Sequence, residues 1–264
     1  MDTEPAPAGR QRRASSFGAA AGQYARYRPD YAEAAVRWCL EPVRGDRPVR
    51  AVDLGAGTGK LTGTLLELGA DVVAVEPDPA MLAELRRQFP GAQAVPGRAE
   101  ALPLPDGSAD AVLCGQAMHW FDLDRALPEI ARVLRPGGML AGLWNVEDDR
   151  AGWVAGLAEV SRSGVTLSRW RARLPAGSEQ GVLRTGSRWF TPVEEHEFGH
   201  GQPQTADSLT ATLATHSHLL VMDEAERVRV LTAIRDFLCR QPETSAGGFT
   251  LPLVTCVLRA TRRP

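Results

Sequence analysis

Short apolar runs alternate with amphipathic segments between residues 49 and 146. The runs predict strands over residues 49–54, 72–75, 92–95, 109–114 and 139–144. Between them, apolar residues recur at helical spacing and predict helices over residues 61–68, 81–89 and 123–134. Prolines and glycines stand at the ends of these segments, where they commonly interrupt regular structure. The alternation predicts an α/β fold with a doubly wound, mostly parallel sheet and right-handed crossovers.

The pattern changes after Asn145. Residues 147–190 show only weak helical periodicity, and we interpret them as an inserted helical cap. The remaining part, residues 191–264, predicts strands and helices over residues 195–202, 207–219, 223–240 and 250–258. Asp207 and Asp223 are candidate N-caps for the two helices. The two added strands would complete a seven-stranded sheet with an antiparallel C-terminal edge.

Length and charge limit the classes of protein to consider. The chain has 264 residues, which suits one large domain or one domain with a cap. A net charge of −2 argues against non-specific nucleic-acid binding. No apolar run reaches the roughly 18 residues that would suggest a membrane span. Residues 1–16 lack the apolar core of a secretory signal, and their Pro, Ala, Gly and Arg content predicts a disordered N-terminal lead.

The cysteines and histidines do not show the spacing of a metal site. The four cysteines lie far apart and lack a C-x-x-C pair, so neither a zinc site nor a disulfide framework is predicted. The histidines have no carboxylate partner at metal spacing, and we expect no metal. This cysteine usage favours a reduced, cytoplasmic compartment.

A glycine-rich turn follows the first predicted strand. Gly55, Gly57 and Gly59 recur at every second residue after Asp53, and Glu76 closes the next strand 21 residues beyond Gly55. Such a unit binds a nucleoside, because the backbone approaches the ligand at the turn and the carboxylate accepts from ribose hydroxyls. The third glycine of the dinucleotide pattern G-x-G-x-x-G is replaced by Lys60, which argues against a nicotinamide oxidoreductase.

Further motifs occur in a fixed order along the chain. After the glycine-rich turn and Glu76 come residues 97–103, residues 116–121 and the turn at residues 134–138. Together these five features resemble the class I S-adenosylmethionine-dependent methyltransferases, specifically the small-molecule subgroup called type 11. The resemblance extends from about residue 17 to residue 260. It implies a Rossmann-like methyltransferase fold, S-adenosylmethionine (SAM) as cofactor and S-adenosylhomocysteine (SAH) as product.

The resemblance also assigns roles to residues of the expected cofactor-binding core, residues 49–146, and of the segment before it. The cofactor site that it implies comprises Tyr24, Arg28, Asp53, Gly55, Ala56, Gly57, Glu76, Pro77, Ala99, Glu100, Gln116 and Ala117. Within this set, Asp53 would receive the ammonium, Glu76 the ribose hydroxyls, and Ala99 with Glu100 the adenine edge. Arg98 departs from the family pattern, in which an aspartate often accepts from the exocyclic amine at that position.

Residues 17–48 resemble the lid helices of this subgroup. All three tyrosines of the chain, Tyr24, Tyr27 and Tyr31, fall within this segment. Aromatic faces beside a sulfonium would stabilise it by about 0.5–2 kcal/mol through cation–π contact. Arg28 could pair with the cofactor carboxylate, and Tyr27 would face the acceptor. The alternative is a packing helix whose tyrosines cover the sheet edge.

His119 and Trp120 follow the fourth predicted strand, at the sheet edge where ligands bind in this architecture. By resemblance, Tyr27, His119, Trp120 and Trp144 would contact the acceptor, and His119 would be the catalytic base. An imidazole suits proton transfer near neutral pH. The alternative is that His119 only shapes the pocket, because alignment of donor and acceptor supplies much of the rate of methyl transfer.

These observations predict a SAM-dependent methyltransferase that acts on a small-molecule acceptor, secondary metabolism being one source of such acceptors. The alternative on the same fold is a binding protein or non-methylating enzyme that retains the cofactor. The identity of the acceptor, the methylated element and the oligomeric state are left open.

Overall fold

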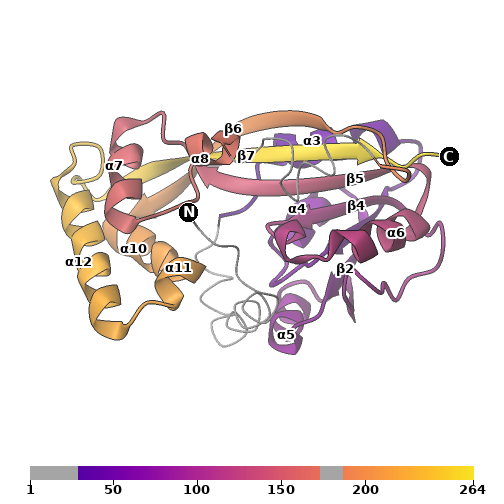
Figure 1. Ribbon diagram of the computed structural model, residues 1–264, viewed down its shortest axis with the longest axis horizontal. Helices are drawn as coiled ribbons and strands as arrows, with labels where there is room; N and C mark the ends of the chain where they lie inside the picture. The colour runs from indigo at the N-terminus through magenta and orange to yellow at the C-terminus, as the bar shows by residue number, and fades with distance from the viewer. Residues whose placement is uncertain (1–28, 173–186) are drawn as a thin grey trace.

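The computed structural model describes residues 29–172 and 187–264, whose strands form a seven-stranded sheet (Figure 1). The strands are β1 (Arg50–Leu54), β2 (Asp71–Glu76), β3 (Gln93–Pro96), β4 (Ala109–Gly115), β5 (Leu134–Glu147), β6 (Glu194–Thr205) and β7 (Gly248–Thr261). Their order is β3-β2-β1-β4-β5-β7-β6, with β1 to β5 parallel and β7 antiparallel to both of its neighbours. The predicted fold class, including its antiparallel C-terminal edge, is confirmed.

Helices connect these strands in the predicted order. They are α3 (Glu33–Leu40), α4 (Lys60–Glu67), α5 (Pro79–Gln88), α6 (Leu123–Val133), α7 (Gly152–Ser161), α8 (Leu167–Ala172), α10 (Ala206–Ala214), α11 (Ser217–Leu220) and α12 (Glu224–Arg240). Asp223 caps α12 as predicted, since its side chain accepts from the backbone N–H of Glu226. The prediction for Asp207 was wrong. Thr205 caps α10 instead, in a reciprocal capping box with Ser208.

Each face of the sheet packs against its own set of helices. On one face, α6 and α8 contribute Ile130, Leu167 and Trp170 to a core with Val52 and Leu140. The other face is covered by α3 and α4, which contribute residues including Val36, Cys39, Leu61 and Leu65. Alternate residues of a strand point to opposite faces. The near-continuous apolar runs of the central strands are therefore buried on both sides, as expected for a parallel sheet.

A separate helical lobe lies beyond the carboxyl end of β5 (left in Figure 1). It contains α7, which follows β5, together with α10, α11 and α12, which connect β6 to β7. Leu157, Leu213, Ile234 and Leu238 from these helices form one buried cluster with Leu253 and its neighbours on β7. The lobe thus combines part of the expected cap, residues 147–190, with helices from the C-terminal segment.

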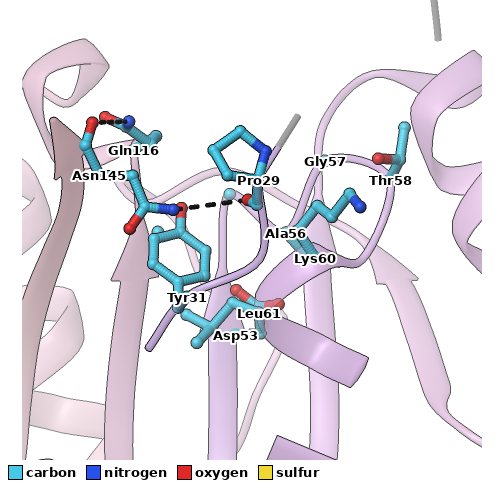
Figure 2. A pocket seen from close by; sticks show the side chains of 12 residues that line it. Pro29, Tyr31, Asp53, Ala56, Gly57, Thr58, Lys60, Leu61, Gln116 and Asn145 are labelled. Atoms are coloured by element: carbon cyan, nitrogen blue, oxygen red, sulfur yellow. Dashed lines mark hydrogen bonds between the residues drawn. The ribbon is translucent and has the colours of Figure 1, made fainter. Parts of the chain in front are cut away.

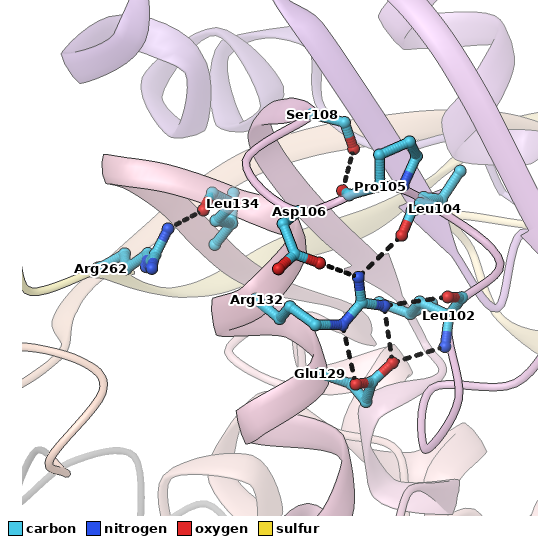
Figure 3. Close-up of polar contacts among 9 residues, drawn as sticks. All are labelled: Leu102, Leu104, Pro105, Asp106, Ser108, Glu129, Arg132, Leu134 and Arg262. Carbon is cyan, nitrogen blue, oxygen red and sulfur yellow. Dashed lines mark hydrogen bonds and ion pairs between the residues drawn. The ribbon is translucent and has the colours of Figure 1, made fainter.

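Arg132 of α6 holds the loop that precedes β4 (Figure 3). Its guanidinium donates to the Asp106 carboxylate at 2.6 Å and to the carbonyls of Leu102 and Leu104 at 3.0 and 2.9 Å. Glu129, one turn earlier, accepts from Arg132 and from the backbone N–H of Leu102, both at 2.9 Å. This network fixes the chain directly after Ala99 and Glu100, the residues predicted at the adenine edge.

Among the described helices, none combines the length and the hydropathy that a membrane crossing would require.

Candidate functional site

The glycine-rich turn joins β1 to α4 in a left-handed backbone conformation. Gly55, Gly57 and Gly59 have φ angles of +71°, +57° and +95°, which side chains rarely adopt. A Cβ on Gly55 would lie 2.6 Å from the Cβ of Ala117, in the loop after β4. Glycine at this position therefore lets the turn and the post-β4 loop meet, and the structure brings these two predicted site residues together.

Glu76 ends β2 directly beside this turn. It is 5% exposed, and its two carboxylate oxygens accept from the backbone N–H groups of Gly57 and Asp78, each at 2.8 Å. Burial raises the pKa of Glu76, and the two hydrogen bonds oppose that rise. Each carboxylate oxygen has a second lone pair, so Glu76 can still accept from two ligand hydroxyls.

Asp53 is a buried carboxylate in the same turn. It is 1% exposed, and its Oδ2 accepts from Thr62 Oγ1 at 2.6 Å. Within residues 29–172 and 187–264, its Oδ1 has no hydrogen-bond partner. Burial, with a smaller contribution from the Glu76 charge, raises the pKa of Asp53 from 3.8 to about 7. A cation at Oδ1 would satisfy this atom and stabilise the ionised carboxylate.

The turn opens into a pocket of about 480 Å³, a volume that includes space open to solvent (Figure 2). The residues that line it are Pro29, Tyr31, Asp53, Gly55, Ala56, Gly57, Thr58, Lys60, Leu61, Gly115, Gln116 and Asn145. It lies at the carboxyl ends of β1, β4 and β5, where ligands bind in open α/β sheets. The pocket unites five of the predicted cofactor residues, namely Asp53, Gly55, Ala56, Gly57 and Gln116.

Seven further residues of this pocket were not in the predicted site, and three of them have contacts that shape it. Lys60 forms an ion pair with Asp30 at 3.0 Å, which ties the glycine-rich turn to the chain before α3. Tyr31 packs over Gly115, where an added Cβ would lie 2.5 Å from the tyrosine oxygen. The third residue, Asn145, lies near the end of β5. The sequence held a signal for two of these residues. Tyr31 belongs to the cluster of three tyrosines, and Asn145 is a polar residue at the end of a predicted strand.

Gln116 has an unusual backbone conformation at the end of β4. Its φ angle is +54°, which is strained for a residue other than glycine. Its backbone N–H donates to the carbonyl of Leu143 at 2.9 Å, and its side-chain Nε2 donates to the carbonyl of Asn145 at 3.0 Å (Figure 2). Such strain persists where surrounding contacts enforce it, and it is commonly found at functional sites.

Asn145 holds the chain directly before α3, within the predicted lid segment of residues 17–48. Its Nδ2 donates to the Asp30 carbonyl at 3.0 Å, and its Oδ1 accepts from Thr255 Oγ1 of β7 at 2.6 Å. Thr255 Oγ1 in turn accepts from the backbone N–H of Ala32 at 3.0 Å. His200 of β6 adjoins this network, with its Nε2 3.3 Å from Asn145 Oδ1, and burial lowers its pKa. Three strands thus hold the start of the described chain.

A second pocket, of about 390 Å³ including space open to solvent, adjoins the first between the sheet and the helical lobe. Pro29, Gln116 and Asn145 line both pockets. The second pocket otherwise combines residues from β5, β6, β7 and α10 with Val165 and His216, and Glu147 is the carboxylate in its described lining. Two ligands bound in these pockets would meet at the three shared residues.

The other predicted cofactor residues lie elsewhere. Ala99 is buried beside the core of the α6 face, and Glu100 accepts from the backbone N–H of Asp122 at 3.0 Å. Pro77 is exposed at the start of the loop before α5. Tyr24, Tyr27 and Arg28 lie outside the described residues. None of the three described residues lines either pocket, so their cofactor contacts stay predictions.

The predicted acceptor residues do not gather at the second pocket. His119 and Trp120 lie in the 3₁₀ turn η3 (Met118–Trp120), half-buried and stacked on each other with ring centroids 4.6 Å apart. Trp144 points to the opposite face of β5 from Asn145 and stacks on Trp170 in the core. Neither pocket is lined by any of the three, and the catalytic role of His119 stays a prediction.

The sheet order and the pocket at its carboxyl edge define a Rossmann-like protein that binds a nucleoside cofactor. A putative type II methyltransferase from Anaeromyxobacter dehalogenans shares the fold, with a TM-score of 0.58, 24% identity, and coverage of 89% of this chain and 98% of that one. The family model described as a methyltransferase domain matches residues 52–142.

Relatives extend this match to nearly the whole chain. An uncharacterized methyltransferase of Mycobacterium tuberculosis (strain H37Rv) is 42% identical over 247 residues, 93% of this chain and 95% of the relative. The malonyl-[acyl-carrier protein] O-methyltransferase of Methylococcus capsulatus is 47% identical over 103 residues, 37% of this chain and 38% of the relative. The chain belongs to the SAM-dependent methyltransferases.

The residues of the first pocket, together with Glu76 beside the glycine-rich turn, fit SAM. Asp53 Oδ1 has no hydrogen-bond partner among the described residues and can accept from the methionine ammonium. Glu76 has free lone pairs that can accept from the ribose hydroxyls. Beside Gly57, an added Cβ would meet only the Met81 sulfur at 3.8 Å among described residues, so the turn leaves open space for a ligand. When bound, SAM supplies an electrophilic methyl group on a positively charged sulfur.

The affinity for SAH is expected to rise with pH. The ammonium of SAH favours ionised Asp53, and this carboxyl has a pKa of about 7 in the unliganded protein. Binding below that pH must therefore release a proton, so affinity increases by up to about tenfold per pH unit and levels off near pH 7. Calorimetry between about pH 5.5 and 7.5 would measure this slope. Asp53→Asn should bind more weakly and flatten it, whereas equal affinities of the native protein across this range would contradict the assignment.

Proposed function

We propose that this methyltransferase transfers a methyl group to a small molecule that occupies the second pocket. The supporting observation is the boundary between the two pockets, where Pro29, Gln116 and Asn145 line both. An acceptor in the second pocket would face the cofactor across this boundary. The second pocket also lies beneath α10 and beside residues buried in the lobe, which suits a small ligand better than a macromolecule.

The residues at the boundary would act by alignment. Gln116 and Asn145 are held by backbone and side-chain hydrogen bonds, so their positions are largely fixed before ligands bind. Holding donor and acceptor in line can supply much of the rate of a displacement reaction. His119 is proposed as a base only if the acceptor extends to η3. In that case, His119→Ala lowers kcat without changing SAH affinity.

Methyl transfer can be followed with SAM that carries a labelled methyl group. The protein would be incubated with the small-molecule ultrafiltrate or with the protein fraction of a bacterial extract. We expect label in small molecules of the ultrafiltrate, together with release of SAH. Label confined to the protein fraction would contradict the proposal. SAH binding without transfer in either fraction would favour the alternative of a non-methylating protein that retains the cofactor.

A carboxylate acceptor is the second candidate. The 47% identity to the Methylococcus capsulatus relative, named for action on a malonyl carrier protein, favours it. The match covers 38% of that relative, however, and a carrier protein would deliver label to the protein fraction. The same assay therefore separates the two candidates.

Gln116→Asn is expected to separate folding from activity. Asparagine tolerates the left-handed conformation better than glutamine, but its shorter side chain would not span the 3.0 Å contact to the Asn145 carbonyl. The free energy of unfolding should therefore change by less than about 1 kcal/mol, while labelled-methyl transfer falls by about tenfold or more. Thermal unfolding and the transfer assay measure the two effects. Full activity in Gln116→Asn would remove this side chain from the reaction.

A further inference from the structure

A row of three polar side chains crosses the antiparallel strands on the face that carries α3. Asn145 on β5 lies directly opposite Thr255 on β7, and His200 on β6 contacts both. Apolar residues flank the row, with Val257 in the core beneath α3 and Leu253 in the core of the helical lobe. Asn145 and Thr255 are 5% and 0% exposed. Polar groups buried at such a place are costly unless each is hydrogen-bonded.

The hydrogen bonds of this row determine where two of its protons lie. Asn145 Nδ2 donates to the Asp30 carbonyl at 3.0 Å, so the amide oxygen Oδ1 is the atom that faces Thr255. Thr255 Oγ1 accepts from the backbone N–H of Ala32 at 3.0 Å and lies 2.6 Å from Asn145 Oδ1. The single hydroxyl proton must lie on this short contact, because two acceptor oxygens would otherwise repel each other.

His200 must then donate through Nε2. This nitrogen lies 3.3 Å from Asn145 Oδ1 and 3.2 Å from Thr255 Oγ1, and both oxygens can only accept from it. Burial lowers the pKa of His200, and the charge of Asp30 opposes that shift only in part. The ring is therefore neutral at neutral pH, with its proton on Nε2.

We propose that His200 is a positioning residue for methyl transfer, whose Nε2–H holds the Asn145 side chain at the boundary between the two pockets. Asn145 lines both pockets and lies beside Gln116 and Pro29 there (Figure 2). His200 is not in the described lining of either pocket, so it acts through Asn145 and Thr255 and not on a ligand. This inference rests on the proposed function, because it places the reaction at that boundary.

The tautomer of His200 is the first measurement. Two-bond proton–nitrogen NMR correlations of the protein labelled with ¹⁵N-histidine report which ring nitrogen carries the proton. The chain has five histidines, and the signals of His200 are those lost in His200→Gln. We expect the Nε2–H tautomer at neutral pH. The Nδ1–H tautomer would overturn the inference, because His200 could not then donate to Asn145.

Two substitutions separate the donor of His200 from its bulk. His200→Leu removes the donor, whereas His200→Gln can place an amide N–H near the position of Nε2. We expect His200→Leu to lower labelled-methyl transfer by about tenfold without a loss of SAH affinity, because it affects alignment at the boundary. His200→Gln should retain most of the native transfer.

His196→Leu is the matched control on the same strand. His196 lies four residues from His200 and so shares its face, but it is exposed and stacks on Trp38 and Phe198. Its replacement removes an imidazole from β6 without touching the polar row. Native transfer and native SAH affinity are expected for this variant.

Exchange of the Ala32 amide hydrogen gives a readout that does not depend on an acceptor. This amide donates to Thr255 Oγ1, so it reports how firmly the row holds the chain before α3. Loss of the donor in His200→Leu should accelerate its exchange by about five- to tenfold, and His200→Gln should restore slow exchange. Exchange at the native rate in His200→Leu would show that His200 does not hold the row.

The remaining outcomes also decide the inference. Equal loss of transfer in His200→Leu and His200→Gln would show that the ring acts by packing, and native transfer in His200→Leu would remove His200 from the reaction. A parallel loss of SAH affinity would place its effect on the cofactor instead of the boundary. If the native protein binds SAH but transfers no label, the proposed function fails, and the catalytic role of His200 fails with it.

Discussion

Valine in place of Gly57 is expected to abolish SAH binding while the protein stays folded. The branched side chain would project into space that the protein leaves open, since the nearest described atom to an added Cβ is the Met81 sulfur at 3.8 Å. The left-handed backbone at φ +57° would cost about 1–2 kcal/mol of stability. Calorimetry should then detect no binding at SAH concentrations on the order of 1 mM, the range of very weak complexes.

Gly69→Val is the matched control for this strain. Gly69 also has a positive φ, +77°, and an added Cβ there meets no atom within 4 Å. It follows α4 and does not line either pocket. This variant should lose comparable stability and keep its SAH affinity. Native SAH affinity in Gly57→Val would contradict the placement of the cofactor at the turn.

Trp144→Ala should lower the free energy of unfolding by about 3–5 kcal/mol, the usual cost of truncating a buried tryptophan. Its ring is 5% exposed and stacks on Trp170 with centroids 4.7 Å apart. It also covers Gly142 so closely that an added Cβ there would lie 2.4 Å from the indole. Denaturant unfolding, followed by fluorescence, would measure the loss.

Trp120→Ala provides the comparison on the predicted acceptor side. Because Trp120 is half-buried, we expect its truncation to cost about 1 kcal/mol or less, within the range for sites outside the core. A stable Trp144→Ala protein that had lost labelled-methyl transfer while it kept its SAH affinity would restore Trp144 to the acceptor site. A Trp144→Ala protein that is less stable but binds SAH with native affinity when folded would agree with the position of Trp144 in the core.

The cofactor half was predictable because its signals are local. The apolar run before Asp53, the glycines at alternate positions and the carboxylate of Glu76 lie within one strand–turn–helix–strand unit. Their relative placement follows from parallel pairing of neighbouring strands, in which Asp53 lies opposite Ala74 on β2. The five predicted residues in the first pocket come from this unit and from the end of β4.

The residues around the second pocket, where we propose that the acceptor binds, were harder to predict because their contacts join distant segments. The hydrogen bond from Asn145 to Asp30 spans 115 positions, and no local pattern specifies it. The face of Trp144 could have been derived, since alternation along β5 places Asn145 and Glu147 together on the other side. The resemblance to the family placed Trp144 at the acceptor. The alternation of side chains along β5 instead directs Asn145 and Glu147 toward the second pocket.

The unequal strand lengths have a consequence for how this chain can change. β5 and β7 contain 14 residues each and β6 contains 12, compared with four to seven in β1 to β4. The long strands carry α10 to α12 as a single excursion between β6 and β7. Exchange or resizing of that excursion would remodel one wall of the second pocket without shifting the register of the strands that hold Asp53 and Glu76. With the acceptor in the second pocket, as we propose, acceptor choice and cofactor use are separable traits, which evolution or a designer can vary one at a time.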